Sequence, residues 1–548
     1  MSAFLWTKNK RIQELYDKYN NINPADIYHP GKLFWIENRA GERSPVSPEE
    51  LAGKSADEII RINLDFKPSP GSKETKDGFA NAIKNDVINN PDKYINNLYK
   101  FEYPDSKIEL VFIDAIISGL YEVWKNDCSK IQDSELMTYI RSVIENVDFN
   151  ANKPEDSIFD YRFSILSTCV SMIKNICEND NYVITSNFLS FMKEILEILN
   201  TKLEEFIYEE DDYNKSFLVT PRGMIFEAMI QWSLRNARMN KQDDKDKWDD
   251  DVRNVFDFWL KKKDDSNFDF LDAVASCLPN MYYLDKQWVE NNFDKIFDIN
   301  SAKWGISFSG YVSYYNTVYE VLYNIFKQKG HYEKALQTEF ENTFINQKVV
   351  QHIYVGYLDD WEDINDEKSL IRKILDAGKK DQIEYLIRFF CNGKIEDDET
   401  IDNKKREMYK KVKSKVRLLW KYIYEKYKDK PEIFVLTIDL LCLLDELDNE
   451  NIEWIKAIAK NISRRHDISI IIKSYEKHID KNPEFIAGIH ILLLESKLNF
   501  RFYEDEIKNM VIKLYEKGLR EEADEICNKH AENGEFFLRA IYNENNKG

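Results

Sequence analysis

Apolar side chains recur every three or four residues along most of the chain, and this helical spacing limits the possible fold more than any other feature. The clearest example begins at Thr220, which can cap a helix whose first residue is Pro221. Apolar residues then lie about one turn apart in three segments: Met224, Ala228 and Trp232; Val252, Phe256 and Trp259; Trp288, Phe293 and Phe297. A helix with one apolar stripe needs neighbours that cover it. We therefore expect helices that stack on one another in chain order.

A proline followed directly by an acidic residue marks many of the expected helix starts. Proline fits the first helical position, and a neighbouring acid interacts favourably with the positive end of the helix dipole. The six pairs are Pro48-Glu49, Pro91-Asp92, Pro104-Asp105, Pro154-Glu155, Pro431-Glu432 and Pro483-Glu484. Helix pairs recur roughly every 35 to 45 residues, although none matches a repeat consensus closely. The prediction is an all-α solenoid of degenerate helix pairs, similar to tetratricopeptide or HEAT repeats, with an irregular N-terminal cap.

Prolines, glycines and acidic runs divide the expected solenoid into four parts. Residues 1–75 are interrupted by several proline-containing turns, which predicts an irregular capping segment. Helical blocks are expected at 76–208, 220–392 and 403–548. An acidic stretch that begins at Glu209 separates the first two blocks, and a second stretch around Gly393 separates the last two.

Charge and cysteine usage indicate a soluble cytoplasmic protein that does not enter a membrane. The formal net charge of -20 weighs against general attraction to nucleic acid or to anionic membranes. The N-terminus from Met1 to Asn20 is charged throughout and lacks the apolar core of a signal peptide. The longest uncharged run, Trp304 to Tyr319, is too short and too polar to span a bilayer. The seven cysteines are scattered without a CxxC pair, which is typical of reduced thiols.

Catalytic and metal-binding patterns are weak throughout the chain. Gly53-Lys54-Ser55 resembles the end of a phosphate-binding loop, but Pro48 stands where the first glycine belongs, and the preceding residues indicate a helix start instead of a strand. His352 and His490 lie within helical runs and have no cysteine or serine partner of the triad type nearby. The histidines also lack metal-ligand spacing. We therefore predict no enzyme activity, no cofactor and no metal.

A basic helix over residues 404–428 is the most distinctive local feature of this acidic chain. Met408, Val412, Val416, Leu419 and Ile423 form its apolar stripe. The candidate partner-binding residues are Lys410, Lys413, Arg417, Trp420, Lys421 and Lys428. Such a surface can be a solvated outer face that balances nearby acids, a contact strip for an acidic partner, or a site for phosphates and stacked bases.

Several motifs on either side of Pro221 match a known pattern. They are Ser44-Pro45-Val46-Ser47-Pro48-Glu49-Glu50-Leu51, Gly78-Phe79-Ala80, Pro221-Arg222-Gly223 with Glu227-Ala228, Trp248-Asp249-Asp250-Asp251-Val252-Arg253, Trp288-Val289 and Trp304. Taken together, they resemble the C-terminal helical-repeat region of bacterial STAND NTPases of the antiviral Avs type. In that family an effector and a central ATPase precede the repeats, and neither is visible in this sequence.

The resemblance implies that the chain is a sensor that wraps around a folded viral protein such as a terminase or a portal. It also implies an ATPase and effector portion supplied in cis or in trans. The alternatives are a nucleic-acid-binding repeat protein that uses helix 404–428, or a general intracellular scaffold for other proteins.

Overall fold

The structure is a computed structural model, and it describes residues 43–68, 73–127, 130–131, 133–149, 160–203, 220–240, 247–262, 267–314, 317–392, 403–462, 468–496, 498 and 500–546. Most of the expected capping segment and both expected block boundaries, 209–219 and 393–402, lie outside these residues. The described part is α-helical, and its extended-chain pairing is a single bridge between Arg43 and Glu74. The all-α prediction is therefore confirmed. No helix in the described part is both long enough and apolar enough to cross a membrane.

The chain divides into two compact units, Met1–Phe256 and Asp257–Gly548. The helices of unit 1 are α3 (Pro48–Ala52), α4 (Ala56–Asp65), α5 (Lys76–Asn89), α6 (Pro91–Ile95), η2 (Leu98–Phe101), α7 (Leu110–Asn126), α8 (Asp133–Asn146), α9 (Tyr161–Glu178), α10 (Ser186–Lys202) and α11 (Pro221–Asn240). Helix α12 (Asp250–Lys261) contains the division between the units.

The helices of unit 2 range from 4 residues in α23 to 25 residues in α22. They are α13 (Phe268–Ser276), α14 (Leu278–Leu284), α15 (Lys286–Ile296), α16 (Trp304–Tyr314), α17 (Glu320–Gln328), α18 (His331–Gln337), α19 (Thr343–Leu358), α20 (Leu370–Ala377), α21 (Lys380–Asn392), α22 (Asn403–Tyr427), α23 (Pro431–Phe434), η6 (Val435–Leu443), α24 (Asn449–Asn461), α25 (Ser469–His478), α26 (Pro483–Glu495), α27 (Glu504–Glu516), α28 (Arg520–Glu532) and α29 (Arg539–Asn545).

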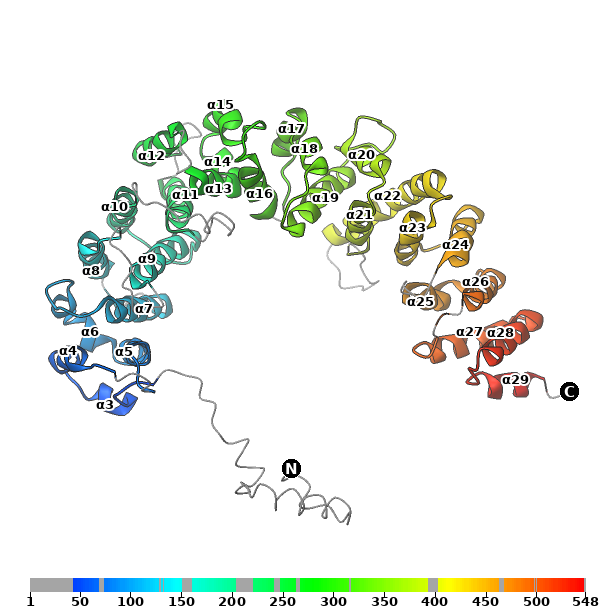
Figure 1. The fold of residues 1–548 in the computed structure, drawn as a ribbon, viewed down its shortest axis with the longest axis horizontal. Helices are drawn as coiled ribbons and strands as arrows, with labels where there is room; N and C mark the ends of the chain where they lie inside the picture. Colours follow the sequence, from blue (N-terminus) through cyan, green and yellow to red (C-terminus); the bar gives the residue numbers. More distant parts are fainter. Residues whose placement is uncertain are drawn as a thin grey trace, which may run out of the picture. The chain divides into compact units, whose positions relative to one another are not determined.

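Within each unit the helices pack mainly on elements one to three places away in the chain (Figure 1). In unit 1, α5, α7, α9 and α11 pack successively in one row, while α8 packs on α10 beside it. In unit 2, α21, η6, α25 and α27 form part of one row, and α24, α26 and α28 form a second row. This packing of near neighbours in two rows is the arrangement of a helical solenoid.

Local sequence signals account for many helix ends. Thr220 caps α11, because its hydroxyl accepts a hydrogen bond from the backbone N–H of Gly223 at 3.1 Å. Proline is the first residue of α3, α6, α23 and α26, as predicted. Pro104 lies instead in a turn, because α7 begins only at Leu110. Pro154 lies outside the described residues.

Helix α11 is more deeply buried than its sequence suggests. Of the expected stripe Met224, Ala228 and Trp232, the last two are buried and Met224 is only partly buried. Ile225, Phe226 and most other positions of α11 are buried as well. The helix packs against both α9 and α10, so neighbours cover it on more than one side. The one-stripe prediction is wrong here, because neighbours on more than one side of α11 bury most of its circumference.

Four of the free cysteines in the described part are buried, namely Cys169, Cys177, Cys277 and Cys527. Cys391 and Cys442 are partly exposed, and Cys128 lies outside the described residues. Burial raises the pKa of the Cys527 thiol to about 11. Such thiols are poor nucleophiles, because the thiolate is the reactive form.

Candidate functional site

Helix α22 carries the basic residues that the sequence singles out. Its apolar stripe is confirmed in large part, because Val412, Val416, Leu419 and Ile423 are completely buried. Met408, one turn before this stripe, is instead 45% exposed. The four buried residues attach α22 to unit 2 and direct its charged side chains away from the apolar core.

Three of the basic side chains meet acids from the next helical pair. Lys413 pairs with Asp445, which lies between η6 and α24. The Arg417 guanidinium lies 2.6 Å from Asp448 and 3.1 Å from Glu450, and the Lys421 Nζ lies 2.7 Å from Glu450. Hydrogen bonds from Lys421 and then from Arg417 lower the pKa of Glu450, so this carboxylate stays ionised.

The same alternation of charges continues through the following helices. Asp445 also accepts a hydrogen bond from Lys477 at 2.9 Å, and Glu446 accepts one from Lys481 at 2.8 Å. Asp480 in turn lies 3.4 Å from the Nζ of Lys513 and 3.3 Å from that of Lys517. We call this series of pairs from Lys413 to Lys517 the ion-pair ladder. Its pairs lie at every second helix connection, namely those between η6 and α24, between α25 and α26, and after α27. Its acids already neutralise cations that a phosphate would otherwise bind.

The other candidate residues of α22 lie in different surroundings. Trp420 is completely buried, with its ring centroid 5.7 Å from that of Trp454. Lys410 pairs with Glu407 at 2.9 Å and keeps 73% of its side chain exposed. Lys428 is exposed just after the end of the helix. The structure therefore brings Lys413, Arg417 and Lys421 together with acids, while Trp420 lies in the core.

Sequence reasoning missed the partners of the basic helix. Asp445, Asp448 and Glu450 form an acidic turn that follows Lys413 by about one repeat length. A repeat-length spacing between a run of cations and a run of anions is the signal that could have identified them. The role of the six residues as a partner contact remains a prediction.

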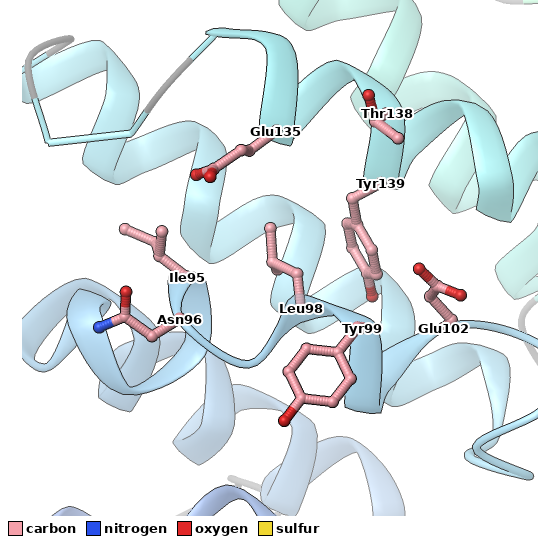
Figure 2. Close-up of a pocket in the computed structure, with 8 residues that line it drawn as sticks. All are labelled: Ile95, Asn96, Leu98, Tyr99, Glu102, Glu135, Thr138 and Tyr139. Carbon is pink, nitrogen blue, oxygen red and sulfur yellow. The ribbon is translucent and has the colours of Figure 1, made fainter.

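A hollow of about 460 Å³ lies beside α8 in unit 1. Figure 2 shows Glu135 and Glu102 at opposite ends of it, with the rings of Tyr99 and Tyr139 closer to Glu102. The Tyr139 hydroxyl donates to the carbonyl of Phe101 at 3.3 Å. No buried polar group without a partner points into the hollow from the residues that line it, so its acidity alone identifies no ligand.

A second depression, of about 370 Å³, lies between α25 and α27 of unit 2; we call it the α25/α27 groove. Its lining includes Ile512, which is 40% exposed, above the buried Ile472 and Met510. The charged residues of the lining are Lys473, Glu476, Glu506, Lys513 and Glu516. Apolar side chains surrounded by both signs of charge are suited to contact with a protein surface.

The remaining candidates for chemistry lie in structural positions. The Gly53-Lys54-Ser55 segment joins α3 to α4, and Ser55 caps α4 by accepting a hydrogen bond from the backbone N–H of Glu58. His352 and His490 are both buried, and each has a tyrosine hydroxyl at its Nδ1. Over the described ranges, no group of three or more His, Cys, Asp or Glu residues is arranged to hold a metal ion.

Comparison with known proteins assigns no family to the chain. No family model, no curated protein and no solved structure matches it. The arrangement of sequentially packed helices is therefore the basis on which function must be argued.

Proposed function

We propose that this chain is a non-catalytic cytoplasmic solenoid that recognises a folded protein. The observation that carries the proposal is the packing of helices on near neighbours in two rows, because such arrays present an extended surface made from many successive helices. The α25/α27 groove offers a contact area within unit 2, since Ile512 is exposed there among charges of both signs.

A more specific role is the ligand-sensing part of a bacterial antiphage STAND NTPase. Support for it comes from the motifs between Ser44 and Trp304 that resemble the repeat region of the Avs type. In this role the ligand is a viral protein such as a terminase or a portal, and the ATPase and effector portion is supplied in cis or in trans. Binding energy would come from apolar residues at the centre of the contact, with charged residues around them.

The experiment is direct binding of the full chain to purified viral terminase and portal proteins, measured by size-exclusion chromatography and calorimetry. We expect a stable complex with one of them that persists at high salt. Ile512→Glu should weaken this complex at least tenfold. Leu64→Glu is the matched control, because Leu64 is 44% exposed and lies in unit 1, away from the α25/α27 groove. A folded chain that binds neither protein would remove the sensor role.

A further inference from the structure

Four polar side chains form a continuous hydrogen-bonded series inside unit 2. The Tyr475 hydroxyl of α25 lies 3.0 Å from Nδ1 of His490 on α26. The Nε2 atoms of His490 and of His530 on α28 are 2.8 Å apart, and Nδ1 of His530 lies 2.7 Å from Oε2 of Glu535. Both histidines are completely buried, and Tyr475 is 2% exposed. We call this series the relay.

The end of α28 places Glu535 against His530. The backbone N–H of Glu535 donates to the carbonyl of His530, and that of Gly534 donates to the carbonyl of Ala531, both at 2.9 Å. These two bonds form a Schellman cap, which requires the left-handed φ of 82° found at Gly534. The cap folds the chain back on its own helix, so the Glu535 carboxylate is held at His530 by local backbone geometry.

The hydrogen bonds of the relay can run in one direction only while Glu535 is ionised. A carboxylate accepts hydrogen bonds and cannot donate them, so Nδ1 of His530 carries a proton and donates it to Glu535. In a neutral imidazole the other nitrogen is then the acceptor, so Nε2 of His530 accepts from Nε2–H of His490. His490 must in turn accept at Nδ1 from the Tyr475 hydroxyl. Every group in the relay is then satisfied.

One added proton reverses this direction, and a second proton cannot be accommodated. A charged His530 donates from both nitrogens, to Glu535 and to Nε2 of His490. His490 must then move its own proton to Nδ1 and donate to the Tyr475 oxygen. If both rings were charged, two N–H groups would face each other across 2.8 Å. The pair therefore has room for a single proton.

The apolar surroundings of the relay make it unfavourable for either histidine to carry a charge. Among the described residues, the electrostatic partners of the two rings are each other and Glu535, and their ring contacts outside the relay are to Phe500 and Phe537. Burial, and then the neighbouring His530, lower the pKa of His490 well below its ordinary value. After reversal, the hydroxyl hydrogen of Tyr475 loses its acceptor on His490. A buried donor without a partner destabilises the packing around it.

We propose that the relay Tyr475–His490–His530–Glu535 is a one-proton switch that loosens the packing of α25, α26 and α28 when it binds its proton. Acidification below about pH 6.5 favours the loosened form, because both histidines take up protons near their ordinary pKa there, whereas the closed relay has room for one proton at most. Proton binding would therefore loosen the row α24, α26 and α28. It would also loosen one wall of the α25/α27 groove, because Tyr475 belongs to that wall.

The test is nitrogen NMR of the full chain labelled selectively in its seven histidines, with signals assigned from His490→Asn and His530→Asn. At pH 7.5 we expect the uncommon Nδ1–H tautomer at His530 and the Nε2–H tautomer at His490. Titration to pH 5 should add no more than one proton to the pair while the fold persists. An Nε2–H tautomer at His530, or two charged rings in a folded chain, would overturn the proposal.

Two variants test whether Glu535 sets the direction of the hydrogen bonds, or whether burial of the histidines alone explains their tautomers. Glu535→Leu removes the acceptor that sets the direction, so His530 should no longer be held in the Nδ1–H form. Tyr475→Phe keeps Glu535 and should leave that tautomer unchanged. Hydrogen exchange supplies the conformational readout. Protection factors in α26 and α28 should fall at least about tenfold per pH unit below about 6.5, because the opened form binds two protons and the closed relay one at most. Unchanged protection in these helices, or an unchanged tautomer in the Glu535→Leu protein, would contradict the switch.

Discussion

Replacing Trp420 is the sharpest test of how helix α22 works, because this residue was a candidate contact and lies in the core. Its side chain is completely buried, and its ring lies beside that of Trp454, which is 3% exposed. Truncating a buried tryptophan to alanine removes its apolar contacts and leaves a cavity, at a cost of about 3–5 kcal/mol. We therefore expect Trp420→Ala to destabilise unit 2 by about this amount.

The indole nitrogen makes a second, opposite prediction possible. Nε1 of Trp420 is buried and has no hydrogen-bond partner, and a buried unpaired donor costs about 1–3 kcal/mol. Trp420→Phe removes this donor and keeps most of the aromatic contact. The lost volume and the removed penalty act in opposite directions, so the phenylalanine variant should lie within about 1 kcal/mol of the parent.

Urea unfolding followed by circular dichroism measures both variants, and hydrogen exchange in α22 and α24 assigns the loss to unit 2. Exchange is needed because a two-unit solenoid can unfold in steps, so one transition need not report one unit. The expected order of stability is parent and Trp420→Phe together, with Trp420→Ala well below. An alanine variant that is as stable as the parent but has lost a protein ligand would refute the core assignment and restore Trp420 as a contact residue.

Three further changes test other parts of the structure. Gly378→Ala should destabilise unit 2 by about 1–3 kcal/mol in urea unfolding, because Gly378 has a φ of 64° and an added Cβ would lie 2.6 Å from the Tyr427 hydroxyl. Gly305→Ala is the control, since nothing lies within 4 Å of the position that its Cβ would take. Burial lowers the pKa of His352 to about 3, below an unfolded value of about 6.5. Its contribution to stability is therefore present above about pH 6.5 and is lost as pH falls, and His352→Asn should flatten the acid side of a stability–pH profile by up to about 1.4 kcal/mol per pH unit. Asp445→Asn should lower the free energy of unfolding by less than about 1 kcal/mol, and by nothing at high salt, because the carboxylate is 49% exposed. A larger loss of stability in urea titrations at both low and high salt would show that the ion-pair ladder contributes more than a screened surface interaction.

Periodicity predicts which residues are helical, but it cannot say how many sides of a helix are covered. The stripe Val412, Val416, Leu419 and Ile423 of α22 was predictable because α22 has a charged face that its neighbours leave exposed. The burial of helix α11 was not predictable, because it depends on how α9 and α10 pack around it, and the periodicity of α11 alone does not record this. Helix starts at proline were predictable for a local reason, since the first turn needs no donor from that residue.

The candidate site shows where a single sequence stops being informative. From the sequence alone, lysines on one side of a helix look free to bind a partner. In the structure, acids about one repeat later in the chain pair with them, as Asp445 does with Lys413 and Glu450 with Lys421. A similar spacing brings together His490 and His530, which are 40 residues apart in the chain. The only part of this arrangement that the local sequence indicates is the helix cap at Gly534-Glu535. In a solenoid, then, charge and polarity in one helix pair have to be interpreted with the pair that follows. A basic ridge is a candidate for binding only where its repeat-length neighbour supplies no acid. By that criterion, Lys410 of α22 and Lys428 just after it are the candidate residues that remain suited to contact a partner.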